Sequence, residues 1–291
     1  KMVLQEGEKF LLRGMETLAA QSVFALVHVL GSVVVRFIFS WLEEGLFPVF
    51  SKLLVQASSL PDADPAKKVL YQKAATILGL LNKLMTYIGL VFAAFGNNYA
   101  YLLLELLYTS KYSETSAPTV LGWYCVYILV MAVNGITEAF AHAAAPASTL
   151  VFFNVAMLFQ SALYIASAIF FTKTGYAAAF IMASILVMLS RILVSFFFIA
   201  NFFRDHVNAN TFQIGKFLPH PLVILMFAIS YAATRLSELS LCSQGHKVQV
   251  WACGQHVLVG GLSLLVTALV AFLLERRYFR ELISFVKTRD V

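Results

Sequence analysis

The chain has 291 residues, of which 60% are hydrophobic and 12% are charged, and its mean hydropathy is +0.81. A water-soluble domain of this size could not stay dispersed with that balance, so the composition excludes one and predicts an all-α polytopic membrane protein. The formal net charge of +6 requires no nucleic-acid partner, because Lys and Arg collect in the cytosolic loops of membrane proteins.

A helix needs about 20 mostly apolar residues to cross the hydrocarbon core of a bilayer. We expect seven such spans, near residues 20–50, 75–95, 119–142, 147–172, 175–203, 218–238 and 250–274. An eighth candidate, 1–18, carries charged residues at helical spacing, among them Glu6 and Lys9. This segment either lines a polar cavity or lies at the membrane interface.

The distribution of Lys and Arg indicates the orientation of the spans. If 1–18 crosses the membrane, most loop cations fall on one side, and the other side receives only Lys111, Lys173, Arg235 and Lys247. Without that crossing the asymmetry weakens. The sequence therefore favours about eight spans with both ends of the chain in the cytosol.

Ionisable groups at bilayer depth are costly unless they face a cavity or a partner, so each is a functional candidate. In the span 20–50, Arg36 and Glu43 are two helical turns apart on one face, and Glu44 lies beside them. They predict either a charged wall of a translocation pathway or a structural ion pair with a neighbouring helix.

The span 119–142 contains a second polar pattern. Asn134, Glu138 and His142 follow at intervals of four and form one stripe. We favour a cavity role for Glu138 over simple hydrogen bonding between helices. His142 is expected near the cytosolic end, where a solvated histidine is more common than a ligand.

Lys83 and Arg191 lie inside other spans, where long side chains can also extend toward water. If both faced the same cavity as Arg36, the three cations would suit an anionic head group. Arginine presents a planar fork to phosphate oxygens, and lysine presents a point charge.

Tyrosines flank the non-cytosolic loop after span 75–95 and are typical of an aromatic interface belt: Tyr99, Tyr101, Tyr108 and Tyr112. Gly260 and Gly261 would permit a close approach of the last span to another helix. The segment after that span alternates basic and apolar residues: Arg276, Arg277, Phe279, Arg280, Leu282 and Phe285. It predicts a short amphipathic cytosolic helix on anionic lipid, or a solvated basic tail.

Enzyme chemistry has little support. A membrane glycosyltransferase could hold a metal at Asp62 and Asp64, but Pro61 and Pro65 flank this pair, and Asp beside Pro is common in turns. The sequence has no zinc-type His/Cys cluster, phosphate-binding Gly-rich loop or Gly-x-Ser-x-Gly turn. We expect no catalytic residue, metal or cofactor.

Several blocks occur in order along the chain: Glu6-Gly7-Glu8-Lys9-Phe10, Gly31-Ser32, Arg36-Phe37-Ile38-Phe39, Glu43-Glu44, Tyr124-Cys125, Asn134-Gly135-Ile136-Thr137-Glu138, Asn154 and Arg191. With them the sequence resembles the Rft family of endoplasmic-reticulum membrane proteins, whose corresponding motifs include E-G-E-R-Y and N-G-V-T-E. Two positions depart from the family: Ser40-Trp41 replaces Gln-Pro, and Ser184 stands where Asn is expected.

The resemblance implies the multidrug/oligosaccharidyl-lipid/polysaccharide exporter fold, in which two helical lobes surround a central cavity. Residues 1–203 would form the C-terminal lobe with about six spans, and 204–291 would add two spans and a cytosolic tail. The N-terminal lobe would lie in a preceding part of the same protein, which the present sequence does not include.

The resemblance also implies the translocation of dolichol-pyrophosphate oligosaccharide in N-glycosylation, as a transporter or an accessory factor, with membrane lipids as further partners. The implied substrate-binding residues are Glu6, Glu8, Lys9, Arg36, Glu43, Glu44, Lys83, Asn134, Glu138 and Arg191. The cations would attract phosphate, and the acidic and amide groups would bind sugars or hold the cations. The alternative is a cation-coupled exporter of small molecules, with Glu43, Glu44 and Glu138 carrying the ion.

Overall fold

The computed structural model describes residues 17–175, 177–207, 214–242 and 250–288. Throughout these ranges the chain forms helices and turns, with no β-strand. Seven helices are long and apolar enough to cross a membrane. The prediction of an all-α polytopic membrane protein with seven apolar spans is therefore confirmed, whereas the eighth candidate, 1–18, lies almost entirely outside the described residues.

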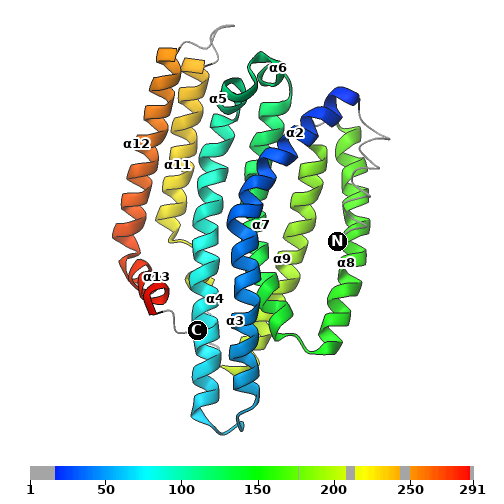
Figure 1. Cartoon of the computed structure of the whole chain (residues 1–291), viewed down its shortest axis with the longest axis vertical. Helices are drawn as coiled ribbons and strands as arrows, with labels where there is room; N and C mark the ends of the chain where they lie inside the picture. The colour runs from blue at the N-terminus through cyan, green and yellow to red at the C-terminus, as the bar shows by residue number, and fades with distance from the viewer. Residues whose placement is uncertain (1–16, 176, 208–213, 243–249, 289–291) are drawn as a thin grey trace.

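The helices follow one another along the chain as shown in Figure 1. Short π-helical segments between them are named η in the text. Their bounds are α2 (Leu18–Val34), η1 (Val35–Phe39), α3 (Ser40–Ser58), α4 (Pro65–Val91), η2 (Phe92–Gly96), α5 (Asn97–Tyr108), α6 (Ser110–Ser113), α7 (Ala117–Ala144), α8 (Ala147–Lys173), α9 (Ala179–His206), α10 (Ile214–Phe217), α11 (Pro221–Ser237), η4 (Glu238–Cys242), α12 (Val250–Leu274) and α13 (Arg276–Thr288).

Helix α7 is the central element of the bundle. It packs against α2, α3, α4, α5 and α9, while α8 packs on α9 at one side of the molecule (Figure 1). Its apolar side chains enter a core of buried aromatic rings, in which Phe140 contacts Phe50 and Phe203, each ring at 5.1 Å between centroids. The polar residues of α7 are thus held on a helix that is surrounded by neighbours.

The predicted span 75–95 is much shorter than the observed helix. The carboxylate of Asp64 accepts a hydrogen bond from the amide of Ala66, and Pro65 occupies the first turn, so α4 begins ten residues earlier than residue 75. At the other end η2 continues directly into α5, and the run ends where Thr109 adopts a positive φ of 56°. Hydropathy alone identified only the apolar middle of this element.

The last two long helices, α11 and α12, pack on each other and against the α4–η2–α5 side of the bundle (Figure 1). Polar groups join them to α5. The amide of Asn98 donates to the carbonyl oxygen of Tyr231 at 2.9 Å and to the hydroxyl of Thr234 at 2.7 Å. Nε2 of the fully buried His256 lies 3.2 Å from the carbonyl oxygen of Asn98. Because hydrogen bonds inside a membrane protein hold helices together, we assign these groups a structural role.

Tyr99 belongs to the same junction, and its place in an interface belt stays a prediction. Its hydroxyl donates to the carbonyl oxygen of His256 at 2.6 Å, and the two rings stack at 4.2 Å. A Cβ on Gly260 would lie only 2.0 Å from this hydroxyl, whereas a Cβ on Gly261 would meet nothing within 4 Å. The predicted close approach is therefore made at Gly260, not at Gly261.

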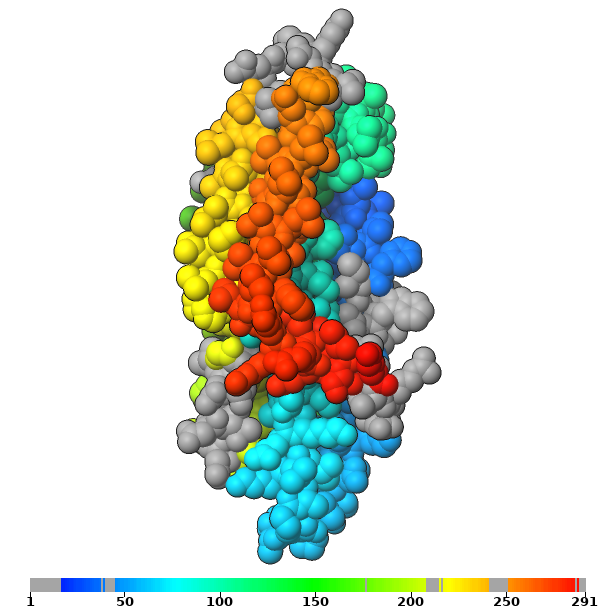
Figure 2. Space-filling view, turned by 90° about the vertical axis from the view of Figure 1, so that its left-hand side faces the viewer, coloured from blue at the N-terminus to red at the C-terminus, as the bar shows by residue number. Residues whose placement is uncertain are grey.

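Helix α13 turns away from the axis of α12 and crosses over α4 (Figure 2). Tyr278 is buried against α4, where its hydroxyl donates to the carbonyl oxygen of Leu80 at 3.1 Å. Arg276, Arg277 and Arg280 are exposed on the opposite face. The prediction of a short amphipathic helix is confirmed, and its contact with anionic lipid stays a prediction.

Candidate functional site

An ion pair between α7 and α9 brings predicted site residues together. Oε1 of Glu138 lies 2.9 Å from Nη2 of Arg191, and the two side chains are 14% and 16% exposed. One turn earlier on α7, the amide of Asn134 donates to the other carboxylate oxygen of Glu138 at 2.7 Å. Glu138, Arg191 and Asn134 therefore form one cluster, in which a guanidinium and an amide hold both oxygens of the carboxylate.

The Asn134–Glu138–Arg191 cluster keeps hydrogen-bonding capacity. Oδ1 of Asn134 is buried and accepts no hydrogen bond from any described residue. Buried amide oxygens in native proteins usually have a partner, so a water molecule or a ligand is the natural donor here. The guanidinium of Arg191 pairs with Glu138 and does not extend toward the membrane surface.

His142 does not continue the polar stripe as a free side chain. Its Nδ1 lies 2.9 Å from the carbonyl oxygen of Glu138 in its own helix, and its ring packs 5.4 Å from that of Phe153. The i to i+4 pattern was read correctly, but only Asn134 and Glu138 of the three pair through their side chains.

Lys83 belongs to a separate ion pair. Its Nζ lies 3.0 Å from Oε2 of Glu275, at the junction of α12 and α13, and the side chains are only 10% and 6% exposed. The ammonium also lies 5.1 Å from the ring centroid of Tyr278. The other oxygen of Glu275 accepts the backbone amide of His220 at 2.5 Å. The structure therefore does not place Lys83 in one site with Glu138 and Arg191.

Sequence reasoning missed Glu275, although a signal existed. It is the acidic residue at the end of an apolar span, directly before the basic tail that begins at Arg276. Its partner lies 192 positions away in the sequence, a separation that no periodicity reveals.

The outer face of α2 carries a row of polar residues at bilayer depth. Gln21, His28 and Ser32 of α2 and Arg36 of η1, which continues α2, recur at spacings of seven, four and four, so they lie within one side of this helical run. His28 and Arg36 are exposed, and Gln21 and Ser32 are partly exposed. Arg36 was predicted as a site residue, whereas the other three were missed even though their spacing was readable.

The opposite face of α2 explains why this row points outward. Gly31 lies against the ring of Tyr124 on α7, where a Cβ would come within 2.0 Å of the ring carbon Cε1. Val23 and Val27 are buried on the same face. Close packing of the small and apolar face on α7 therefore leaves the polar row partly or fully exposed, although the ring of His28 still meets that of Tyr124 edge-on at 6.3 Å between centroids.

The remaining predicted site residues are not described in the structure. Glu6, Glu8 and Lys9 lie outside the described residues. Glu43 and Glu44 lie in α3, but their side chains are outside the described part. The proposed cluster of Arg36 with these carboxylates stays a prediction.

The acidic pair before α4 has structural partners. Asp64 caps the helix, and Asp62 forms an ion pair of 2.6 Å with Lys67. The hydrogen bond from Lys67 holds the pKa of the Asp62 carboxyl below its ordinary value. Among the described residues no group of three or more His, Cys, Asp or Glu side chains could hold a metal ion.

The model of a family described as "Rft protein" matches residues 1–285 of the chain. The chain belongs to the Rft family. The resemblance found in the ordered sequence blocks is thereby confirmed. No solved structure matches this Rft chain.

Three similar Rft proteins carry the name Man(5)GlcNAc(2)-PP-dolichol translocation protein RFT1. The Xenopus tropicalis protein is 34% identical over 95% of this chain and 50% of its own length. The Mus musculus protein is 32% identical over 99% and 51%. The Dictyostelium discoideum protein is 28% identical over 94% and 49%. The chain thus spans about half the length of these relatives.

Proposed function

We propose that this Rft chain is the C-terminal half of a membrane protein that moves a dolichol-pyrophosphate oligosaccharide from the cytosolic to the lumenal leaflet of the endoplasmic reticulum in N-glycosylation, or assists that movement. The observation that carries the proposal is the outward polar face of α2. A face with Arg36 and His28 cannot rest against acyl chains, so water or a second lobe must cover it. The names of the relatives supply the class of lipid that a passage at this face would accept.

The residues of the proposed passage bind different parts of the head group according to their charge. The exposed guanidinium of Arg36 binds pyrophosphate oxygens, and His28 and Ser32 add hydrogen bonds along the same face. Asn134 and Glu138 present amide and carboxylate oxygens to sugar hydroxyls, while Arg191 compensates the charge of Glu138. The polyprenyl tail stays in lipid, and rocking of this lobe against the N-terminal lobe carries the head group across.

The orientation follows from the cations at the two ends of the bundle. The end that holds the α3–α4 turn and α13 carries Lys67, Lys68, Arg204, Arg276 and Arg277, among others. The described cations at the opposite end are Lys111, Lys173 and Arg235. We place the first end, together with the C-terminal end of this segment, in the cytosol by the positive-inside rule. Because α2 begins at the opposite end (Figure 1), the N-terminal end is cytosolic as well when 1–18 crosses the membrane, as we propose. The chain is then a multi-pass protein of the endoplasmic-reticulum membrane.

The alternative functions fit the geometry less well. A cation-coupled exporter would need Glu138 to take up a proton or a metal cation, but Arg191 already compensates this carboxylate. A glycosyltransferase would need Asp62 and Asp64 for a sugar phosphate, but both serve the turn before α4. We therefore propose a function without catalysis and without a cofactor.

The test uses the full-length protein reconstituted in lipid vesicles with a labelled dolichol-pyrophosphate oligosaccharide. Arg36→Gln removes a charge-assisted contact with phosphate, so translocation should slow about tenfold or more. The matched control is Arg235→Gln, an arginine on α11 that pairs with Glu238 away from α2. Its translocation rate should equal that of the wild type. Unchanged translocation in the Arg36 variant would contradict a passage at α2 and favour an accessory role.

A further inference from the structure

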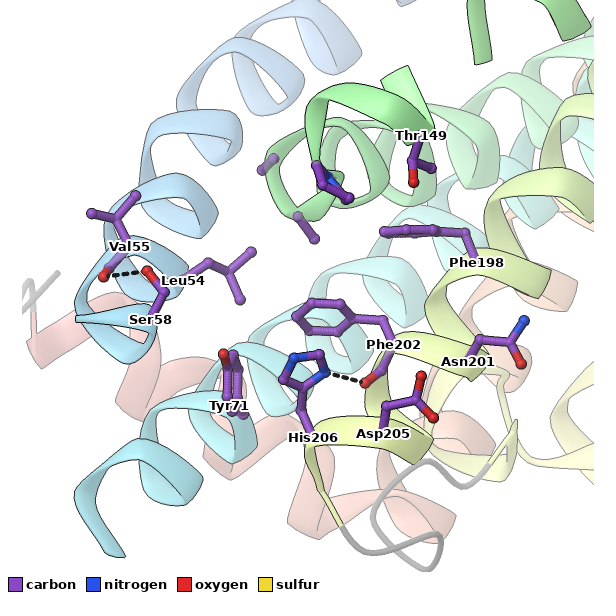
Figure 3. A pocket seen from close by; sticks show the side chains of 13 residues that line it. Leu54, Val55, Ser58, Tyr71, Thr149, Phe198, Asn201, Phe202, Asp205 and His206 are labelled. Atoms are coloured by element: carbon purple, nitrogen blue, oxygen red, sulfur yellow. Dashed lines mark hydrogen bonds between the residues drawn. The ribbon is translucent and has the colours of Figure 1, made fainter. Parts of the chain in front are cut away.

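A pocket lies at the end of the bundle where α3, α7 and α9 end and α4 and α8 begin (Figure 3). Its volume is about 500 Å³, within the roughly 300 to 1,000 Å³ that is typical of small-molecule sites. None of the predicted site residues lines it, and neither does any residue of the outer face of α2. The pocket is therefore a feature separate from the passage proposed above.

Aromatic rings form one side of this pocket. Phe202 stacks on His206 at 4.4 Å between ring centroids, and Tyr71 meets His206 edge-on at 4.8 Å. Phe198 continues the surface beside Phe202 (Figure 3). Because these rings pack on one another, they present a continuous apolar floor and not a box of separate ring faces.

Uncharged and acidic polar groups surround the floor. Ser58, Thr149, Asn201 and Asp205 line the same pocket (Figure 3). The amide of Asn201 offers both donors and an acceptor, and the hydroxyls of Ser58 and Thr149 retain acceptor lone pairs. The carboxylate of Asp205 lies 3.5 Å from Nε of Arg204, which does not line the pocket.

This combination indicates the chemistry of the ligand. No Lys or Arg is among the described residues of the lining, so the pocket offers a phosphate no permanently charged cation. A quaternary ammonium prefers several ring faces arranged around it, whereas these rings form a single floor on one side of the pocket. A sugar has an apolar C–H face and a rim of hydroxyls, which matches an aromatic floor with mixed donors and acceptors.

We propose that the pocket binds a sugar residue of a neutral oligosaccharide. Under the orientation given above it opens at the cytosolic end, where a lipid-linked glycan approaches before its head group enters the membrane. Its part in translocation rests on the proposed function, whereas the binding of sugar does not. The pocket then acts as an entry subsite that holds the glycan while the pyrophosphate reaches α2.

The experiment measures binding of a free mannose-containing oligosaccharide, without lipid or pyrophosphate, to the full-length protein in detergent by isothermal calorimetry. Asn201→Leu and Asp205→Ala each remove hydrogen bonds from the rim and should weaken binding about tenfold. The matched control is Asp62→Ala, which removes an exposed carboxylate at the same end but outside the pocket. It should bind the oligosaccharide as the wild type does.

Thermal unfolding of each variant verifies that weaker binding does not reflect loss of the fold. Absence of saturable binding to the wild type would overturn the proposal, as would wild-type affinity in both rim variants. Binding of phosphocholine in place of the oligosaccharide would show that the ligand class is wrong. The translocation rate of Arg36→Gln is measured separately, so failure of the pocket and failure of the α2 passage give different results.

Discussion

Two ion pairs of nearly equal length, one part-buried and one buried, differ in what surrounds them. Glu138–Arg191 at 2.9 Å joins two neighbouring helices inside the lobe, and Lys83–Glu275 at 3.0 Å joins α4 to the start of α13. The first pair stands beside an amide oxygen that no described residue satisfies. The second is also contacted by the amide of His220 and the ring of Tyr278, and the hydroxyl of Tyr87, which has no hydrogen-bond partner among the described residues either, is buried near Glu275. A buried charge alone therefore does not mark a binding site, and we expect only the Glu138–Arg191 pair to take part in translocation.

The largest effect on stability should come from breaking the Lys83–Glu275 pair. Lys83→Met leaves Glu275 buried without its cation, and loss of one partner of a buried pair costs about 3 to 5 kcal/mol. The free energy of unfolding in detergent should fall by that amount. The double variant Lys83→Met with Glu275→Leu should recover most of it, because no uncompensated charge remains. Equal stability of wild type and single variant would show that water reaches this junction.

The Glu138–Arg191 pair should respond differently to substitution. Glu138→Gln removes the charge that compensates Arg191, and hydrogen bonds to charged groups contribute about 1.5 to 3 kcal/mol. Stability should fall by less than in Lys83→Met, while translocation of a labelled dolichol-pyrophosphate oligosaccharide in vesicles should fall about tenfold. The double variant of Lys83 and Glu275 serves as the control and should keep wild-type translocation. An equal loss of translocation in Glu138→Gln and in the double variant of Lys83 and Glu275 would contradict the distinction between the two pairs.

The smallest effect should come from the exposed pair Asp62–Lys67. The pKa of Asp62 is lowered by Lys67, so any stabilisation is present above the ordinary carboxyl pKa and is lost as the pH falls through the lowered value. Water screens this pair, so Asp62→Asn should leave the melting temperature near that of the wild type at neutral pH. A large shift of the melting temperature would mean that the α3–α4 turn is packed against something not yet identified.

The sequence was most informative where one helix carries the whole pattern. The stripe from Asn134 to Glu138 and the amphipathic segment after Arg276 are local periodicities, and the structure contains both. The partners of those residues were not predictable. Lys83 and Glu275 meet only because α12 returns to the side of α4, and Tyr99 stacks on His256 because Gly260 leaves room for its ring. Contacts between distant segments depend on packing, which no spacing rule in a single sequence encodes.

The helical run from Pro65 to Tyr108 has 44 residues, which is roughly 66 Å of path in a hydrocarbon layer roughly 30 Å thick. Part of this helical run must lie outside the hydrocarbon layer, and its lower tip, together with the end of α3, extends beyond the other helices (Figure 1). A fluorophore attached near Asp62 would sit on the end of a long lever whose upper part is anchored to α7 and α11. Small tilts inside the membrane would become large displacements of that tip, which makes the turn a natural place from which to watch the lobe move.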